Sequence, residues 1–335
     1  MTTSETGAEG IPAAAMSPVG PRAAYVPQLS SGEMPENVLF AVTFGGGPAA
    51  AHSVRVPLEA VAGSALAEVW YATGPVLNGT SGPIRHRADD NFLAGVIEVD
   101  EAGHGGIEGA AEFAYRAIAG LQRGSNYPRL LRTWNHVDAI NLGDGDAERY
   151  RGFCSGRVAG LDGRPLTQFP AATVIGRRDG KRVLQVYWLA GRRPGIALEN
   201  PRQTSAYRYP RQYGQTSPTF SRAMLVSTDT LMVSGTASIV GHASQHPGSV
   251  AGQVDEILEN LDTLLSRAQA QSAELPAHFS GSTLVKAYVR HRADVAEVER
   301  RLRAQLPDGA PMLVLLGDVC RADLLVEFDC LHTAG

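Results

Sequence analysis

Cysteines, long basic runs and long apolar runs are scarce or missing in this sequence. Cys154, Cys320 and Cys330 form no CxxC pair, and their odd number argues against a disulfide framework. The net charge is -4 and no long basic run occurs, which argues against a nucleic-acid partner. No apolar run is long enough to span a membrane, and residues 1–20 lack the basic start and apolar core of a signal peptide. We therefore expect a cytoplasmic protein without a membrane partner.

Several motifs of known chemistry are also missing. No GxSxG occurs, so the usual signpost of a serine hydrolase is absent. His242 and His246 have the spacing of a helical zinc pair, but the Glu of HExxH is missing. We expect these histidines to have a structural role or to form a polar pocket wall, and we expect no metal site. The Gly-rich run at 45–48 lacks the spacing of phosphate-binding loops, so we interpret it as a turn.

The chain has 335 residues and is 44% hydrophobic, which is enough for two domains with separate cores. Residues 1–33 are rich in Gly, Ala, Pro, Ser and Thr without a period, so we expect a disordered tail. Strand and helix patterns then follow in a similar order twice, which predicts an α+β fold. We place the domains at residues 34–165 and 166–335, each a sheet backed by helices.

Hydrophobic periodicity gives the individual elements. The expected strands are 38–44, 67–72, 95–99, 129–140, 182–190, 224–226, 231–239, 283–289, 312–316 and 324–328. The expected helices are 108–123, 147–159, 254–270 and one that begins near residue 294.

The most informative stretch is 311–330, where two strand-like runs flank a turn. In the second run Val326 and Phe328 alternate with Glu327, so Glu327 lies on the opposite face of the strand. Glu327 is then either a carboxylate that faces solvent or a carboxylic acid that faces a pocket. Cys320 directly precedes Arg321 at the turn and can face the same cavity, whereas Cys330 is in phase with the core residues.

A second polar stretch, residues 199–223, is irregular and rich in arginine and tyrosine. Its members include Arg202, Tyr207, Tyr213 and Arg222. Such a loop either decorates the surface or lines a site for an anion, because guanidinium groups bind carboxylates bidentately and tyrosine hydroxyls add donors.

Several segments in a fixed order resemble the chorismatase family. They are RTWNHVDAIN (132–141), ERYRGFCSGR (148–157), QFPAATVIG (168–176), ENPRQTSAYRYPRQYG (199–214), VSGTASIVGHASQH (233–246) and DVCRADLLVE (318–327). The resemblance implies two Rid/chorismate-mutase-like halves in one chain, each a mixed β-sheet packed on one side by helices. It also implies chorismate as the substrate, loss of pyruvate from its enolpyruvyl ether, and no cofactor. Rid-type proteins are commonly trimers, so we expect a monomer or a homo-oligomer, with a trimer among the options.

The resemblance also assigns residues to roles. Glu327 matches the family's essential glutamate, which would protonate the enol methylene carbon. Gly235 and Cys320 resemble the branch that forms 3-hydroxybenzoate and pyruvate in secondary metabolism; otherwise Gly235 is a strand bulge and Cys320 a core filler. The residues expected to orient the substrate are Arg202, Tyr207, Tyr213, Arg222, Arg290 and Arg321.

Two alternatives remain open at this stage. One is a hydrolase that forms a cyclohexadiene dihydrodiol and pyruvate, a reaction that consumes one water, whereas the 3-hydroxybenzoate branch consumes none. The other is a Rid-like binding protein without catalytic activity.

Overall fold

The computed structural model describes residues 16–17, 19–27, 29, 32, 34–45, 53–62, 66–161 and 169–335. The strands are β1 (Arg22–Val26), β2 (Val38–Phe44), β3 (Val54–Val56), β4 (Ala60–Ala62), β5 (Ala67–Tyr71), β6 (Leu77–Ser81), β7 (Ile84–Ala88), β8 (Phe92–Asp100), β9 (Arg129–Asp138), β10 (Ala171–Arg177), β11 (Val183–Gly191), β12 (Ile196–Leu198), β13 (Ala223–Ser227), β14 (Thr230–Ala237), β15 (Ile239–Val240), β16 (Ala243–Ser244), β17 (Leu284–Val289), β18 (Met312–Leu316) and β19 (Val326–Thr333). The α-helices are α1 (Ile107–Arg123), α2 (Arg149–Gly160), α3 (Val250–Gln271) and α4 (Val295–Gln305).

Local sequence explains why α3 forms where it does. Ser249 is the N-cap, and its side chain accepts a hydrogen bond from the backbone N–H of Gly252. Apolar side chains then recur at helical spacing and form one buried stripe; they are Val254, Ile257, Leu258, Leu261, Leu264 and Leu265. This stripe packs on the seven-stranded sheet, and burial of each such side chain contributes roughly 1.5–3 kcal/mol.

Two large sheets of the described chain share one topology. The six-stranded sheet has the order β10-β9-β11-β8-β7-β6, and the seven-stranded sheet has the order β12-β13-β14-β19-β17-β18-β4. Read in the opposite direction, the second order reproduces the first, with β4 added at the edge. Strands β9 and β10 are parallel, as are β17 and β18, while the other pairs within these two repeats are antiparallel. The predicted α+β fold with two mixed sheets backed by helices is therefore confirmed.

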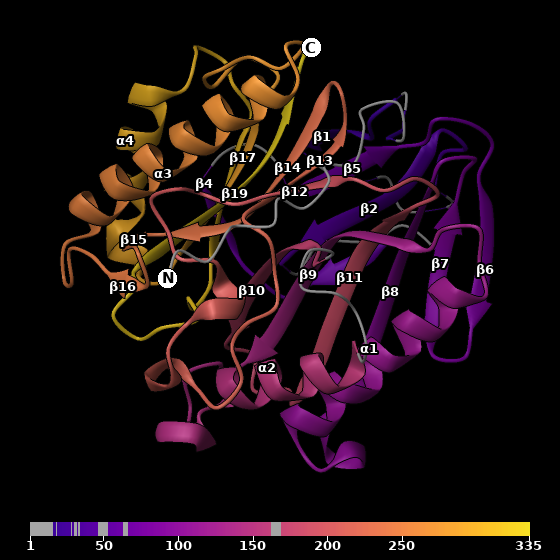
Figure 1. The fold of residues 1–335 in the computed structure, drawn as a ribbon, viewed down its shortest axis with the longest axis horizontal. Helices are drawn as coiled ribbons and strands as arrows, with labels where there is room; N and C mark the ends of the chain where they lie inside the picture. The colour runs from indigo at the N-terminus through magenta and orange to yellow at the C-terminus, as the bar shows by residue number, and fades with distance from the viewer. Residues whose placement is uncertain are drawn as a thin grey trace, which may run out of the picture.

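The sheets and helices form layers (Figure 1). Three main cores of buried side chains lie between these layers. Helices α1 and α2 cover the outer face of the six-stranded sheet, and α3 and α4 cover the outer face of the other. The inner faces of both sheets pack together with the four-stranded sheet, which has the order β1-β5-β2-β3. Side chains on the inner faces thus lie between the two halves.

The predicted domain boundary at residue 165 does not match the sheet topology. Strands β10 and β11 follow that residue, yet they pair with β9 and β8 and complete the six-stranded sheet. The repeats instead meet between Gly191 and Ile196, the ends of β11 and β12. The error arose because long-range strand pairing, which local pattern does not reveal, decides which sheet a strand joins.

The predicted disordered tail is also wrong in one part. Residues 22–26 form β1, which pairs antiparallel with β5 along the edge of the four-stranded sheet. Residues 1–15 lie outside the described residues, as do Gly46, Gly47 and Pro48 of the glycine-rich run. Among the described residues, the structure contains no helix that is both long and apolar enough for a membrane span.

Candidate active site

Glu327 lies near the start of β19, in the interior of the seven-stranded sheet. Its neighbours Val326 and Phe328 belong to the core beneath α3 and α4, so Glu327 points to the opposite, inner face. The predicted alternation is confirmed. The side chain of Glu327 is only 5% exposed, and its carboxyl group forms no hydrogen bond or ion pair with another described residue. A buried carboxyl group without a partner is unusual and calls for an explanation.

Gly235 provides the space that the carboxyl group of Glu327 occupies. A Cβ atom on Gly235 would lie 1.9 Å from Oε1 of Glu327 and 2.8 Å from its Cδ. The register of β14 against β19 also shifts between Val233 and Thr236, so Gly235 sits at an irregularity of the strand. The interpretation of Gly235 as a strand irregularity is therefore confirmed, and its role in product selection stays a prediction.

A pocket with an empty volume of about 600 Å³ opens in front of Glu327. Residues from both halves of the chain form its wall, and those from the first half lie on or next to α2. The lining residues are Glu148, Tyr150, Arg151, Tyr209, Tyr213, Pro218, Phe220, Arg222, Gly235, Ala237, Ile239, Cys320, Arg321 and Glu327. The pocket is large enough for a small organic acid and contains a single fully buried acid, Glu327.

Burial raises the pKa of Glu327 to about 8, and the nearby charge of Asp329 adds to this effect. The guanidinium groups of Arg132 and Arg222 act in the opposite direction but are weaker. At pH 7 the carboxyl group is therefore mostly protonated. Glu327 has the protonation state that a general acid needs.

Two arginines that form no salt bridge with a described residue bring positive charge to the pocket. Arg222 donates to the carbonyl of Thr204 at 2.8 Å and to the hydroxyl of Tyr209 at 2.7 Å, while its buried Nε has no hydrogen-bond partner. Arg321 stacks on the ring of Tyr213 at 3.9 Å and donates to the carbonyl of His242 at 2.9 Å. Neither guanidinium forms a salt bridge with a described residue. Both are available to bind an anionic ligand.

Cys320 lines the same pocket, as the sequence indicated. It packs beside Ala237 and Ile239 in a small hydrophobic cluster. Burial and the proximity of Glu327 raise the pKa of the Cys320 thiol to about 12, so it stays a neutral thiol and not a thiolate nucleophile. The prediction that Cys330 is a core residue is confirmed, since it is buried in a hydrophobic cluster. Cys154 is buried in another cluster, beneath α1 and α2.

Comparisons with known proteins identify the family. The N-terminal model of FkbO/Hyg5-like chorismatases matches residues 68–190. A chorismatase from Streptomyces rapamycinicus is 37% identical over 275 residues, which cover 79% of this chain and 81% of that protein. A 3-hydroxybenzoate synthase from Streptomyces hygroscopicus is 32% identical over 289 residues, or 82% and 84% of the two chains. The chain belongs to the chorismatase family. A chorismatase crystal structure agrees, with a TM-score of 0.83 and 32% identity over 95% of this chain and 100% of that one.

Three of the predicted substrate-binding residues do not line this chorismatase pocket. Arg202 forms salt bridges with Glu256 at 2.6 Å and Glu259 at 3.1 Å on α3. Tyr207 packs against the ring of Phe169. These two predictions are corrected, because polar residues in the 199–223 loop also bind internal partners that the sequence does not reveal.

Arg290, the third, supports the pocket from behind. It forms a salt bridge with Asp318 at 2.7 Å and donates to the carbonyls of Val319, Arg321 and Leu324. It therefore fixes the backbone of residues 318–324, the segment that carries Cys320 and Arg321, and does not line the pocket. The predicted direct contact is replaced by a structural role.

Some pocket residues were missed from the sequence. Tyr150 and Arg151 lie in the ERYRGFC segment, which carried the family resemblance but was assigned no role. The sequence feature that could have identified them is the pair of polar side chains near the start of the expected helix 147–159. His242, expected to have a structural role or to form a polar pocket wall, is not a lining residue, but its Nδ1 lies 3.2 Å from the hydroxyl of Tyr213, which does line the pocket. Among the described residues no group of three or more His, Cys, Asp or Glu is placed to hold a metal ion.

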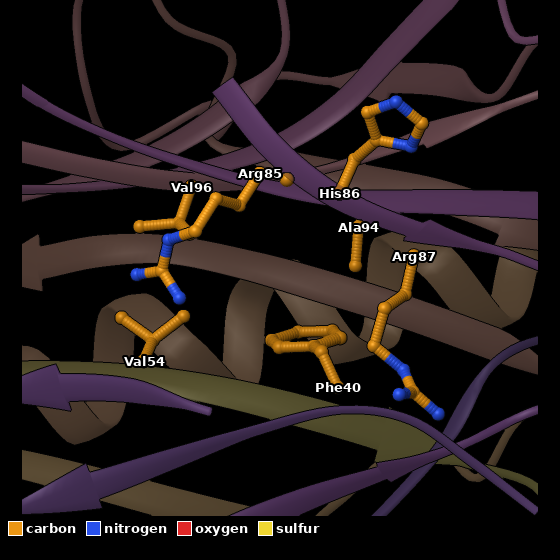
Figure 2. Close-up of a pocket in the computed structure, with 8 residues that line it drawn as sticks. Phe40, Val54, Arg85, His86, Arg87, Ala94 and Val96 are labelled. Carbon is orange, nitrogen blue, oxygen red and sulfur yellow. The ribbon is translucent and has the colours of Figure 1, made fainter. Parts of the chain in front are cut away.

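A second pocket is a weaker candidate for the active site of this chorismatase-family chain. It has an empty volume of about 310 Å³ and contains no acid among its lining residues. Figure 2 shows Arg85 and Arg87 on one side of β7, while the ring of His86 points to the other. The guanidinium of Arg87 is already engaged, because it donates to the carbonyls of Val38 and Leu39 and to Asn78. This pocket offers no group that can donate a proton in the way Glu327 can.

Proposed function

We propose that this enzyme converts chorismate to 3-hydroxybenzoate and pyruvate. The observation that carries the proposal is the carboxyl group of Glu327, which is buried, unpaired and lodged against Gly235 beside an apolar wall. Chorismate is the substrate that the family name indicates, and one relative of similar length is named 3-hydroxybenzoate synthase. A cytoplasmic location, a role in secondary metabolism and the oligomeric state stay predictions.

The charges of the pocket suit a substrate with two carboxylates. Arg222 and Arg321 lie on different segments, and neither forms a salt bridge with a described residue, although the charge of Arg222 acts on the buried carboxyl group of Glu199. We assign them to the two carboxylates of chorismate, with the hydroxyls of Tyr209 and Tyr213 as additional donors. When a carboxylate binds Arg222, it neutralises a charge that otherwise lowers the pKa of Glu327. Substrate binding therefore favours the protonated acid further.

The first chemical step is proton transfer from Glu327 to the enol methylene carbon of the substrate. This transfer turns the methylene group into the methyl group of pyruvate and weakens the bond between the ring carbon and the ether oxygen. General acid catalysis of this kind contributes typically about 10²–10⁴ in rate. Burial serves the step because an exposed glutamate, with an ordinary pKa of about 4.3, would be ionised at pH 7.

The second step decides the product. In the proposed route, the ring hydroxyl attacks the neighbouring ether-bearing carbon as pyruvate leaves, and its proton restores Glu327. The epoxide then opens by breaking the other ring C–O bond, the ring loses a proton to become aromatic, and the phenolic oxygen gains one. All atoms balance without water. The neutral thiol of Cys320 is suited to donate a hydrogen bond to the opening epoxide.

The pocket wall supports this route over hydrolysis. Ala237, Ile239 and the side chain of Cys320 form an apolar surface next to Glu327. A water nucleophile needs two or more polar partners to be held in place, and this surface offers few. Gly235 adds space where a side chain would otherwise displace the acid.

Incubation with chorismate, followed by chromatography and mass analysis, tests the proposal. The expected result is pyruvate and 3-hydroxybenzoate in equal amounts. A dihydrodiol with pyruvate would refute the product assignment but keep Glu327 as the acid. Saturable binding of chorismate without pyruvate, in protein shown to be folded, would refute catalysis and indicate a binding protein.

A further inference from the structure

Behind Glu327, on the inner face of the seven-stranded sheet, lies a group of four buried charges. We name Glu68, Arg132, Lys286 and Asp329 the charge cluster; each is at most 4% exposed. They come from strands β5, β9, β17 and β19 respectively, and thus from all three sheets that meet in the central core. Asp329 is two residues from Glu327 on the same face of β19.

The charge cluster is electrically balanced without Glu327. Nζ of Lys286 lies 2.5 Å from Oε2 of Glu68 and 3.8 Å from Oδ1 of Asp329, and Nη2 of Arg132 lies 3.1 Å from Oδ2 of Asp329. Two cations therefore match two anions. An ionised Glu327 would be a third anion with no cation of its own in the cluster, and burial makes an unmatched charge costly.

The position of Asp329 is determined by its neighbours. The hydroxyl of Thr173 donates to Oδ2 of Asp329 at 2.9 Å, and the hydroxyl of Tyr288 donates to the same oxygen at 3.0 Å. Arg132 donates in turn to the Thr173 hydroxyl at 2.6 Å. Tyr288 is also the cross-strand neighbour of Glu327. Buried ion pairs are seldom a net source of stability, so such a network next to an acid calls for a functional explanation.

We propose that Asp329, held by the charge cluster, is a positioning residue that keeps the carboxyl group of Glu327 neutral and ready to donate its proton. The inference rests on the proposed function for its role in catalysis, but the effect of Asp329 on Glu327 is a property of the folded protein alone. The raised pKa of Glu327, to which the charge of Asp329 contributes, is consistent with it. The other charged or titratable groups that are electrostatically coupled to Glu327 or to the cluster are Tyr25, His136, Tyr187, Arg222, Tyr288, Cys320 and Cys330.

The size of the effect follows from the strand geometry. Residues two apart on one face are about 6.6 Å apart. At this separation and an effective dielectric constant of about 20, one unit charge shifts the titration of a neighbour by roughly 1–2 pH units. Asp329→Asn removes the negative charge and leaves Arg132 without its carboxylate partner, so both changes favour ionised Glu327. The titration midpoint of the Glu327 carboxyl group should therefore move toward lower pH.

The experiment compares the titration of Glu327 in three near-isosteric variants by carbon-13 NMR of glutamate-labelled protein. The Glu327 carboxyl signal is the one that disappears in Glu327→Gln. We expect the titration midpoint of Glu327 to shift downward by roughly 1–2 pH units in Asp329→Asn. The shift should be smaller in Glu68→Gln, because Glu68 lies on another strand, β5. Asp229→Asn is the matched control: it removes a carboxylate paired with Arg22 at 2.6 Å near the other end of the same sheet, and the midpoint should not move.

The kinetic readout is the high-pH limb of kcat with chorismate, which should shift in the same order. A Glu327 midpoint that is unchanged or raised in folded Asp329→Asn would overturn the inference. Should Asp329→Asn fail to fold, Glu68→Gln decides by the same criterion. A shifted midpoint in protein that releases no pyruvate would uphold the electrostatic coupling and refute the proposed function instead.

Discussion

Replacement of Gly235 by alanine should disable the enzyme through a single methyl group. The added Cβ would lie 1.9 Å from Oε1 of Glu327, whereas ordinary contact begins at 3.4 Å. The difference is 1.5 Å, and β14 pairs with β19 on both sides of Gly235, at Val233 and Thr236, so the backbone has little freedom to absorb it. The carboxyl group of Glu327 must therefore move away from its position.

The expected loss is large because catalysis depends on the position of the acid. A misplacement of about 1 Å can cost about 10²-fold in rate. We expect Gly235→Ala to lower kcat by about 10²-fold or more, with a smaller effect on KM, and to direct the residual products toward the dihydrodiol. The assay is steady-state pyruvate release, with chromatography of the ring product.

A matched control separates this effect from that of any added methyl group. Gly120 lies on α1, and a Cβ there would meet nothing within 4 Å. Gly120→Ala should keep wild-type kcat and product. Wild-type turnover and product in folded Gly235→Ala would refute the geometric argument.

Four further predictions concern individual pocket residues. Glu327→Gln should bind chorismate but lose turnover by about 10²–10⁴-fold, as pyruvate release and calorimetric titration would show. Because the pKa of Glu327 is raised to about 8, the folded state holds an extra proton between about pH 4.5 and 8 and is penalised as the pH rises through this window. Glu327→Gln should therefore raise the Tm more at pH 9 than at pH 5, and an equal change at both would contradict the raised pKa. Arg321→Met should raise KM about tenfold or more, whereas Arg202→Met, which breaks salt bridges to α3, should lower Tm but leave KM near its original value; equal effects on KM would contradict our assignment of Arg321. Cys320→Ala should retain pyruvate release but lower the share of 3-hydroxybenzoate, and an unchanged product ratio would exclude Cys320 from product selection.

The elements with strong hydrophobic patterns were predictable from the sequence. The expected strands 38–44 and 312–316 match β2 and β18, and the apolar stripe of α3 was recognised from its spacing. The alternation around Glu327 correctly gave its face of the strand. These features depend on local periodicity, which a single sequence displays.

Features that depend on distant partners were not predictable in the same way. The hairpin β6–β7 was missed because Leu77–Ser81 is largely exposed and has no apolar alternation. The strand β1 was missed because its side chains are only half-buried and its partner is about 45 residues away. The residue type of Arg202 and its sequence neighbours do not indicate whether its guanidinium group binds a ligand or a carboxylate on α3.

The most direct test of the central claim uses chorismate labelled with oxygen-18 in its ring hydroxyl group. If protonation by Glu327 lets that hydroxyl displace pyruvate within the pocket, the label will be retained in the phenolic oxygen of 3-hydroxybenzoate. If the ring product instead keeps the unlabelled ether oxygen and the label leaves as water, or if the product is a dihydrodiol, the intramolecular route is contradicted.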